Sequence, residues 1–360
     1  MKVFYDDRML LHRIPDGVFD SLPSPLLEKQ IEQPEGPDRI INTVSVLRRG
    51  PLSQRLSWGT PVSATDNELL TFHTTDYLQR LKESDKKGKY LSASTYLPAA
   101  GLETARLAAG AVLSALRYVL NDEGSMGYAM CRPPNHHAQP NMADGYCFLN
   151  GIGLAALEAI AQGYKKIAII DWDVHHGNGT QAGLYHRDDI LTVSMHMDHG
   201  SWGASHPESG NVDEIGEAAG EGFNINLPLP FGSGDQCYTA VFERCVVPKV
   251  REFNPDLIIL ANGQDANQFD PNGRQMVTMA GFYTMASTLR ELANEVCGGK
   301  LVMTQEGGYN ATYAPLCAYA VAAGLVGADL ELKDPIAFYP EDSSRAQRDV
   351  QALINRHPLL

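Results

Sequence analysis

An aspartate and a histidine, Asp173 and His175, follow a short apolar segment at residues 165–170. A segment of this kind is typical of a buried parallel strand. Residues two apart on an extended chain point to the same side, so both side chains can aim at one point beyond the strand end. A carboxylate and an imidazole that converge there suit a divalent metal such as zinc. Taken alone, the pair could equally close a strand by binding loop amides.

Further polar groups follow other predicted strands, and these groups are His136-His137, Asp265 and Tyr309. In open α/β sheets, ligands bind beyond the carboxyl ends of the strands, so we expect these groups to meet Asp173 and His175. Asp265 is the natural third metal ligand. Three protein ligands leave coordination positions for water and substrate, which is typical of a catalytic rather than a structural metal.

The elements that must position these groups alternate along the whole chain. Strands are predicted at residues 2–5, 126–130, 165–170, 190–196, 223–227, 256–261 and 300–304. Helices are predicted from about residue 39 and at residues 66–83, 102–120, 151–162, 236–252 and 281–297. This alternation predicts an α/β fold with a doubly wound, mainly parallel sheet and helices on both faces. We find no repeat and no linker, and we therefore predict one domain over residues 1–360.

Three segments carry more specific expectations. In the helix at 66–83, the spacing of the apolar residues predicts an inner face of Leu69, Leu70, Tyr77 and Leu81. The proline-punctuated segment at 12–38 is expected to be irregular, and a loop of that length in a compact enzyme is usually functional or mobile. Residues 84–95 are expected to form a polar loop.

Charge and cysteine content limit the function classes. The formal net charge is −14, which argues against a nucleic-acid-binding surface and mildly favours cationic partners, although solubility alone would explain it. Six cysteines are scattered without a C-x-x-C pair, which is typical of a reduced intracellular protein. We see no leader and no apolar segment long enough to span a membrane, so we expect a cytoplasmic chain without membrane partners. The oligomeric state, including a homo-oligomer, stays open.

With these motifs in place, the chain resembles the zinc-dependent histone deacetylases of class II and their bacterial amidohydrolase relatives, in the arginase–deacetylase superfamily. The resemblance runs from Tyr5 to Tyr309, and its motifs lie at residues 132–138, 144–147 and 171–181, at Asp265 and at Asp270-Pro271. It implies the arginase–deacetylase fold. It also implies an amidohydrolase that uses one zinc ion per chain to remove acetyl or other acyl groups from lysine side chains, in proteins or peptides, or from similar small acylated amines.

The resemblance also implies roles for individual residues. Zinc would be bound by Asp173, His175 and Asp265, acid–base catalysis would fall to His136 and His137, and Tyr309 would polarise the substrate carbonyl. A structural potassium ion would be held by Asp171, Ser194 and main-chain carbonyls that include those of Asp173, His175 and Met195. The substrate channel would include Gly145, Tyr146 and Asn272, with Asn178 and Arg39 as supporting residues.

The departures from related patterns favour a single metal ion. The arginase-like branch binds two manganese ions through D-x-H-x-D and D-x-D-x-x-D-P. Here Gly177 and Asn267 stand in place of the second carboxylate of each pattern. The loss of both carboxylates removes much of the negative charge that a second cation needs.

Asn178 stands where class I deacetylases carry aspartate and class II members usually carry asparagine. If Asn178 faces His137, that imidazole has a neutral partner, whereas His136 would contact the carboxylate of Asp171. We therefore favour His137 as the general base and His136 as the more cationic, orienting residue, with the two titrations coupled.

Other departures concern the substrate. Gln33 replaces the histidine of the family's H-P-E-x-P segment. The loop that usually offers an acidic clamp to a substrate backbone has no acid in register, although Asp85 is nearby. Asn272 replaces an apolar residue, and it either makes the channel wall more polar or serves as a turn residue after Pro271.

Two alternative functions remain. One is an acetylpolyamine amidohydrolase, but Asn272 occupies the position where such an enzyme would carry a glutamate for a distant ammonium. The other is a non-catalytic acyl-lysine-binding protein, and the retention of Tyr309 with both histidines argues against it.

Overall fold

The computed structural model describes residues 1–14, 24–29, 33–200, 209–335 and 342–360. The parts of the predicted irregular segment at 15–23 and 30–32 lie outside the described residues. Residues 12–14, 24–29 and 33–37 contain no helix or strand, as predicted, and a helix begins at Asp38.

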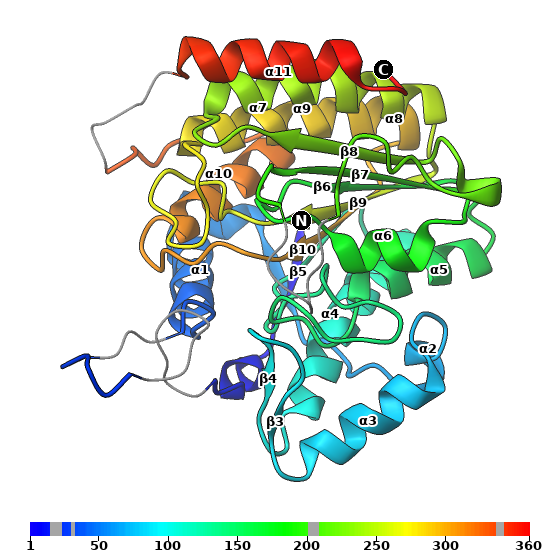
Figure 1. The fold of residues 1–360 in the computed structure, drawn as a ribbon, viewed down its shortest axis with the longest axis vertical. Helices are drawn as coiled ribbons and strands as arrows, with labels where there is room; N and C mark the ends of the chain where they lie inside the picture. The colour runs from blue at the N-terminus through cyan, green and yellow to red at the C-terminus, as the bar shows by residue number, and fades with distance from the viewer. Residues whose placement is uncertain (15–23, 30–32, 201–208, 336–341) are drawn as a thin grey trace.

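A parallel sheet of eight strands forms the centre of the molecule (Figure 1). Its order is β2 (Ser57–Gly59), β1 (Lys2–Phe4), β5 (Met126–Ala129), β10 (Leu301–Gln305), β9 (Leu257–Asn262), β6 (Ile167–Asp171), β7 (Ile190–Met197) and β8 (Asn224–Leu229). Every neighbouring pair is parallel. The seven predicted strands are confirmed to within two residues at each end, and β2 was not predicted.

Helices cover both faces of the sheet (Figure 1). One face carries α4 (Leu102–Leu120), α5 (Gly151–Ala161) and α6 (Asn178–Leu184). The other carries α1 (Asp38–Arg49), α7 (Asp235–Val241), a π-helical turn (Phe242–Val246), α8 (Val247–Phe253), α9 (Met279–Cys297), α10 (Ala314–Val326) and α11 (Ser344–Arg356). The doubly wound α/β prediction is therefore confirmed.

Burial on both faces explains why the strands could be recognised. All residues of β6, β7, β9 and β10 are buried. Strands in this position are nearly continuous apolar segments rather than alternating ones. One hydrophobic core runs from Val3 to Val350, and the single domain over residues 1–360 stays a prediction. Among the described residues, no helix combines the length and apolarity needed to cross a bilayer.

The predicted helix at 66–83 is wrong in its middle. The structure has two helices, α2 (Asp66–Leu69) and α3 (Thr75–Asp85), and the Thr74 side chain caps the second one by accepting a hydrogen bond from Tyr77 N. Leu70 lies in the break and is 43% exposed, so it does not belong to the inner face. Leu69, Tyr77 and Leu81 are buried as predicted. Because Thr74 caps the start of a new helix, residues 66–85 do not form one continuous helix.

The segment at 84–95 is not only a loop. Its residues Lys89–Tyr90 form β3, which pairs antiparallel with β4 (Tyr96–Leu97) to make a small hairpin beside the main sheet. The Asp85 carboxylate accepts a hydrogen bond from Leu102 N at 2.7 Å. This hydrogen bond places the Asp85 carboxylate at the start of α4.

Candidate active site

Three candidate metal ligands meet at the carboxyl ends of two neighbouring strands. Asp173 and His175 follow β6, and Asp265 follows β9, which pairs with β6. The Nδ1 atom of His175 lies 3.1 Å from Asp173 Oδ1 and 3.0 Å from Asp265 Oδ2. All three side chains are buried, and one ligand atom from each lies within 4.8 Å of the other two. The structure therefore brings together the three residues that the sequence predicted.

The spacing and chemistry of this group fit zinc. Ligands about 2.0–2.1 Å from a tetrahedral ion lie about 3.3 Å from one another, close to the separations seen here. Main-chain amides hold the carboxylates in place, because Val174 N donates to Asp265 Oδ1 at 2.8 Å and Gly307 N donates to Asp173 Oδ2 at 2.7 Å. Hydrogen bonds of this kind orient metal ligands and strengthen binding.

Glycine is required where the main chain approaches these carboxylates. A β-carbon on Gly307 would lie 2.0 Å from Asp265 Oδ2, and one on Gly263 would lie 2.2 Å from Asp173 Oδ2. Any side chain at either position would displace a candidate ligand. The close approach also allows Gly307 N to serve as a donor to the metal-binding group.

The His136-His137 pair lies on the loop after β5 and is held by a buried acid from the end of β10. Glu306 accepts hydrogen bonds from Asn135 N at 2.6 Å and from His136 N at 3.1 Å. The ring centroids of the two histidines are 4.0 Å apart. Glu306 thus fixes the main chain of the pair, a role that the sequence did not reveal.

The two histidines have different partners. His136 Nδ1 lies 3.0 Å from Asp171 Oδ2, and His137 Nδ1 lies 2.7 Å from Asn178 Oδ1. Burial disfavours the imidazolium of His136, but the carboxylates of Asp173 and Asp171 outweigh it and raise its pKa to about 10. These carboxylates favour the imidazolium form of His136, and its assignment as the more cationic, orienting residue stays a prediction.

The tautomer of His137 follows from a third hydrogen bond. Asn178 Nδ2 donates to Asp144 Oδ2 at 3.2 Å, which turns Asn178 Oδ1 toward His137. Because that oxygen can only accept, His137 must donate from Nδ1, and Nε2 is then the accepting nitrogen of the neutral ring. A ring fixed in this way can take up a proton at Nε2.

Tyr309 follows Gly308, which has a φ of +114°. Tyr309 N donates to Asp270 Oδ2 at 2.7 Å, which fixes the main chain of the tyrosine. Its ring centroid lies 6.4 Å from that of His175. Burial, with the nearby carboxylates of Asp173 and Asp265, raises the pKa of Tyr309 well above its ordinary value. The side chain therefore stays a phenol and can donate a hydrogen bond near the candidate metal group.

A second aromatic ring, that of Tyr146, faces Tyr309 at a centroid distance of 5.7 Å. Its main chain has a φ of +66°, a conformation that is uncommon for a residue with a side chain and that clusters at functional sites. Thr95 Oγ1 accepts from Tyr146 N at 2.9 Å and holds this loop. The preceding Gly145 passes so close to His137 that a β-carbon there would lie 2.2 Å from the imidazole Cδ2.

Asn272 combines both predicted alternatives. Its main-chain N–H donates to Asp270 Oδ1 at 2.9 Å, as expected of a turn residue after Pro271. Its side chain Nδ2 also lies 3.4 Å from the hydroxyl of Tyr146, so the amide forms part of the wall beside that ring. Asn272 is buried, and its Oδ1 atom has no hydrogen-bond partner within the described part of the chain.

Arg39 contacts both the main chain and an aromatic ring of the site. Its guanidinium donates to the carbonyl oxygen of Glu306 and lies 5.3 Å from the ring centroid of Tyr309. Near it, the buried Glu35 carboxylate lies 3.0 Å from Arg132 Nε. Burial raises the pKa of Glu35, and the two arginines oppose this. Glu35, two residues after the Gln33 that replaces the family histidine, therefore lies in a buried ion-pair network.

The residues predicted to hold potassium are partly brought together. Asp171 on β6 pairs in register with Ser194 on β7, and both line a cavity of about 10 Å³ that is also lined by residues of β8 and α6. Ser194 Oγ is 2.9 Å from His196 Nδ1. Met195 is the next residue of β7 and is buried, but its side chain does not line this cavity.

A model of the histone deacetylase domain matches residues 33–325. The chain belongs to the histone deacetylase family. As a member, it is a deacetylase-type amidohydrolase that acts on acylated lysine or similar acylated amines, and zinc dependence is typical of the family. The predicted family is therefore confirmed.

Individual relatives cover nearly the whole chain. It is 46% identical to histone deacetylase 8 of Arabidopsis thaliana over 360 residues, which cover 99% of this chain and 96% of the relative. It is 39% identical to the histone deacetylase-like amidohydrolase of Pseudomonas aeruginosa, covering 88% and 83%. The solved HDA15 HD domain matches with a TM-score of 0.81 and 32% identity, over 98% of this chain and 96% of that domain. This deacetylase neighbour confirms the predicted arginase–deacetylase fold.

Proposed function

We propose that this deacetylase uses one zinc ion, held by Asp173, His175 and Asp265, to remove acetyl or longer acyl groups from lysine side chains of proteins or peptides. The observation that carries the proposal is the convergence of these three ligands with two histidines and a buried phenol at the carboxyl ends of the strands. A non-catalytic binding protein would not need an acid–base pair and a phenol donor beside its metal.

The protein groups divide the work of amide hydrolysis. When bound, zinc would polarise the substrate carbonyl and acidify a water molecule. His137, with its accepting Nε2, takes the proton of the attacking water, because Asn178 fixes its tautomer. The cationic His136 stabilises negative charge and positions the pair, and one of the two histidines returns a proton to the leaving amine. Tyr309 donates its O–H to the carbonyl oxygen as charge develops there.

A structural potassium ion is part of the proposal. Asp171 and Ser194 provide side-chain oxygens at the small cavity lined by β6, β7, β8 and α6, and main-chain carbonyls including those of Asp173, His175 and Met195 would complete an all-oxygen shell. Such an ion would fix the β6 end from which Asp173 and His175 project. The absence of nucleic-acid and membrane partners and the cytoplasmic localisation remain predictions, and the oligomeric state stays open.

The substrate class is tested by assaying zinc-loaded enzyme in parallel on acetyl-lysine peptides, longer acyl-lysine peptides and acetylpolyamines. We expect the lysine peptides to be hydrolysed with the higher kcat/KM, because Asn272 offers an amide where recognition of a distant ammonium would need a carboxylate. A higher kcat/KM for acetylpolyamines would replace the lysine proposal with the polyamine one.

Metal analysis tests the mononuclear site. We expect one zinc per chain after reconstitution, because Gly177 and Asn267 remove the carboxylates that a second ion would need. Elemental analysis of dialysed protein, together with activity titrated against added zinc, should reach a plateau at one equivalent. Two tightly bound manganese ions per chain would contradict the proposal.

The substitution Tyr146→Ala tests the substrate channel. We expect KM to rise or kcat/KM to fall for acyl-lysine, because the ring that faces Tyr309 would no longer contact the aliphatic stem, while zinc content stays at one per chain. Tyr146→Phe is the matched control, since it keeps the ring and removes only the hydroxyl beside Asn272. Unchanged kinetics in Tyr146→Ala would mean that other residues form the channel.

A further inference from the structure

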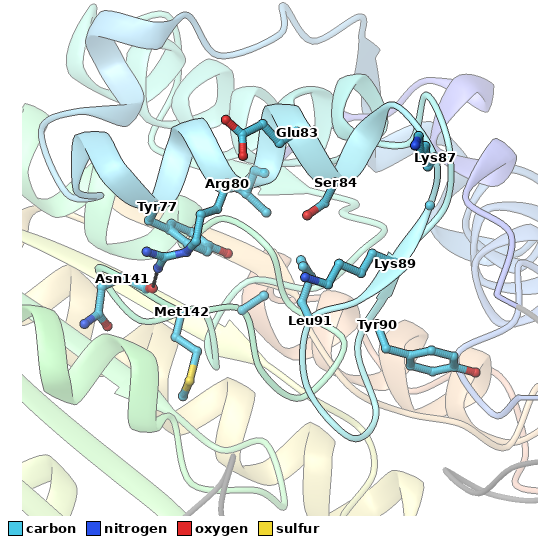
Figure 2. A pocket seen from close by; sticks show the side chains of 13 residues that line it. Tyr77, Arg80, Glu83, Ser84, Lys87, Lys89, Tyr90, Leu91, Asn141 and Met142 are labelled. Atoms are coloured by element: carbon cyan, nitrogen blue, oxygen red, sulfur yellow. Dashed lines mark hydrogen bonds between the residues drawn. The ribbon is translucent and has the colours of Figure 1, made fainter.

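A pocket lies next to the start of the loop that carries Tyr146, because residues 141–143 line it. It has a volume of about 520 Å³ and lies between α3, the β3 hairpin strand and residues 141–143 (Figure 2). Leu91 and Met142 contribute apolar surface to it, and the buried Tyr77, Leu81 and Ala143 lie beneath that surface. The established deacetylase activity does not require this pocket.

The charged residues that line the pocket are mainly basic. Arg80, Lys87 and Lys89 line it, with Glu83 as the single acid. In Figure 2 the Lys89 side chain reaches back across the pocket, whereas the ring of Tyr90 points the opposite way. This local excess of positive charge contrasts with the formal net charge of −14 of the chain.

The nearby acids are engaged elsewhere. Glu83 accepts a hydrogen bond from Gln79 at 2.9 Å, and Asp85 accepts from Leu102 N at 2.7 Å. Lys82, on the same helix, pairs with Asp66, but within the described ranges no ion pair joins Lys87 or Lys89 to a carboxylate. Both lysines are exposed and keep their charge available for a partner.

The pocket and the candidate channel share their walls. Residues 141–143 line the pocket and lead directly into Gly145 and Tyr146. On the opposite side, Leu91 N donates to the carbonyl oxygen of Thr95, and the Thr95 hydroxyl holds Tyr146 N. A peptide whose lysine enters beside Tyr146 would have to cross these loops. An extended chain covers about 3.3 Å per residue, so residues a few positions from the lysine would reach the pocket.

We propose that this pocket binds an acidic segment of the protein substrate, with aspartate or glutamate a few residues away from the acyl-lysine. The inference rests on the proposed function, since it describes how that function selects its substrate. The lysines would pair with the carboxylates, and the apolar surface would contact the aliphatic parts of the same segment. Elsewhere the acidic protein repels such a peptide, so the preference must depend on these lysines.

The test compares acetyl-lysine peptides that are identical except for three glutamates, three glutamines or three lysines on either side of the acetyl-lysine. For the favoured side, we expect kcat/KM for the glutamate peptide to exceed that for the glutamine peptide by about 5-fold at low salt, from pairs that are each weak. The preference should shrink at physiological salt, where the Debye length is about 8 Å. Equal rates for the glutamate and glutamine peptides, or faster hydrolysis of the lysine peptide, would overturn the inference.

Variants locate the preference. Lys87→Glu/Lys89→Glu should abolish or reverse it, whereas hydrolysis of a single acetyl-lysine amide without flanking residues should not change. The charge-matched control is Lys165→Glu/Lys249→Glu. Lys165 lies just before the amino end of β6, and Lys249 lies on α8. These two segments are in contact, because the Lys166 ammonium donates to the carbonyl oxygen of Phe253, the last residue of α8. This control should keep the preference. A preference that persists in Lys87→Glu/Lys89→Glu would place recognition elsewhere.

A binding measurement separates failure of this inference from failure of the proposed function. Fluorescence anisotropy with labelled acidic and glutamine peptides needs no catalysis. If no acetyl-lysine substrate is hydrolysed but the acidic peptide binds more tightly to the parent than to Lys87→Glu/Lys89→Glu, the pocket inference stands and the proposed function is wrong. If hydrolysis occurs and the two peptides bind equally, the proposed function stands and the pocket inference is wrong.

Discussion

Tyr309→Phe is expected to lower kcat on acetyl-lysine by about 10²–10³-fold, or roughly 3–4 kcal/mol, as when one oxyanion donor is removed from other hydrolases. The phenol is buried and stays protonated near the candidate metal group, so it can donate to the carbonyl oxygen as negative charge develops. That hydrogen bond is stronger in the transition state than in the ground state, so its loss should appear mainly in kcat. Single-turnover kinetics would isolate the chemical step.

Two further measurements show whether the loss comes from oxyanion stabilisation. Affinity for a hydroxamate zinc chelator should fall far less than kcat, because the metal ligands remain. Trifluoroacetyl-lysine should be the least affected substrate, because its carbonyl needs less stabilisation. Tyr146→Phe removes a hydroxyl from the facing ring and should leave kcat near the parental value. Hydrolysis of acetyl-lysine by Tyr309→Phe at the parental rate would remove the oxyanion role.

Asp265→Asn is expected to abolish activity at low zinc concentrations through loss of the metal. Removal of a residue that only orients a metal ligand typically lowers affinity by about 10–100-fold, so replacing a ligand itself should cost more than that. Burial and the adjacent Asp173 carboxylate raise the pKa of Asp265 to about 8, although His175 opposes the rise, so we expect the two carboxylates to destabilise each other in the absence of a cation. Metal-free Asp265→Asn should therefore melt no lower than the metal-free parent. Competition with a chelating dye would measure zinc affinity, and scanning calorimetry would measure melting.

Asp235→Asn is the control for a half-buried carboxylate that accepts hydrogen bonds outside the site. Asp235 accepts hydrogen bonds from Thr278 N at 2.8 Å and from its hydroxyl at 2.6 Å, away from the candidate metal group. Its replacement should lower the melting temperature and leave zinc affinity unchanged. If Asp265→Asn retained zinc with parental affinity, Asp265 would not be a ligand.

The groups that carry chemistry were predictable because their types are distinctive and each follows an apolar strand. Asp173, His175 and Asp265 are the clearest examples. The residues that hold these groups were not predictable in the same way. Glu306, Asp270 and Thr95 act by accepting hydrogen bonds from main-chain amides far away in sequence, and that role requires only an oxygen atom at the right place. The motifs at 306–309 and 270–271 marked their positions without revealing what they bind.

The helices were also only partly predictable from the sequence. The fully surrounded α10 is rich in alanine and buried on nearly every side, so it has no polar face from which a helical period could be recognised. By contrast, α11 buries Ala346, Val350 and Leu353 at helical spacing after a serine cap, a pattern that is typical of a helix. The break before α3 depended on the single cap at Thr74.

The strand order has a consequence for synthesis on the ribosome. β10 is the last strand to be made, yet it lies between β5 and β9 in the middle of the sheet. Until residues 301–305 have emerged, no strand pairing can join β2, β1 and β5 to the other four strands of the sheet. Glu306, the anchor of the histidine pair, arrives with the same segment. A nascent chain shorter than this should therefore expose two unpaired sheet edges and depend on chaperones, and it should have no deacetylase activity.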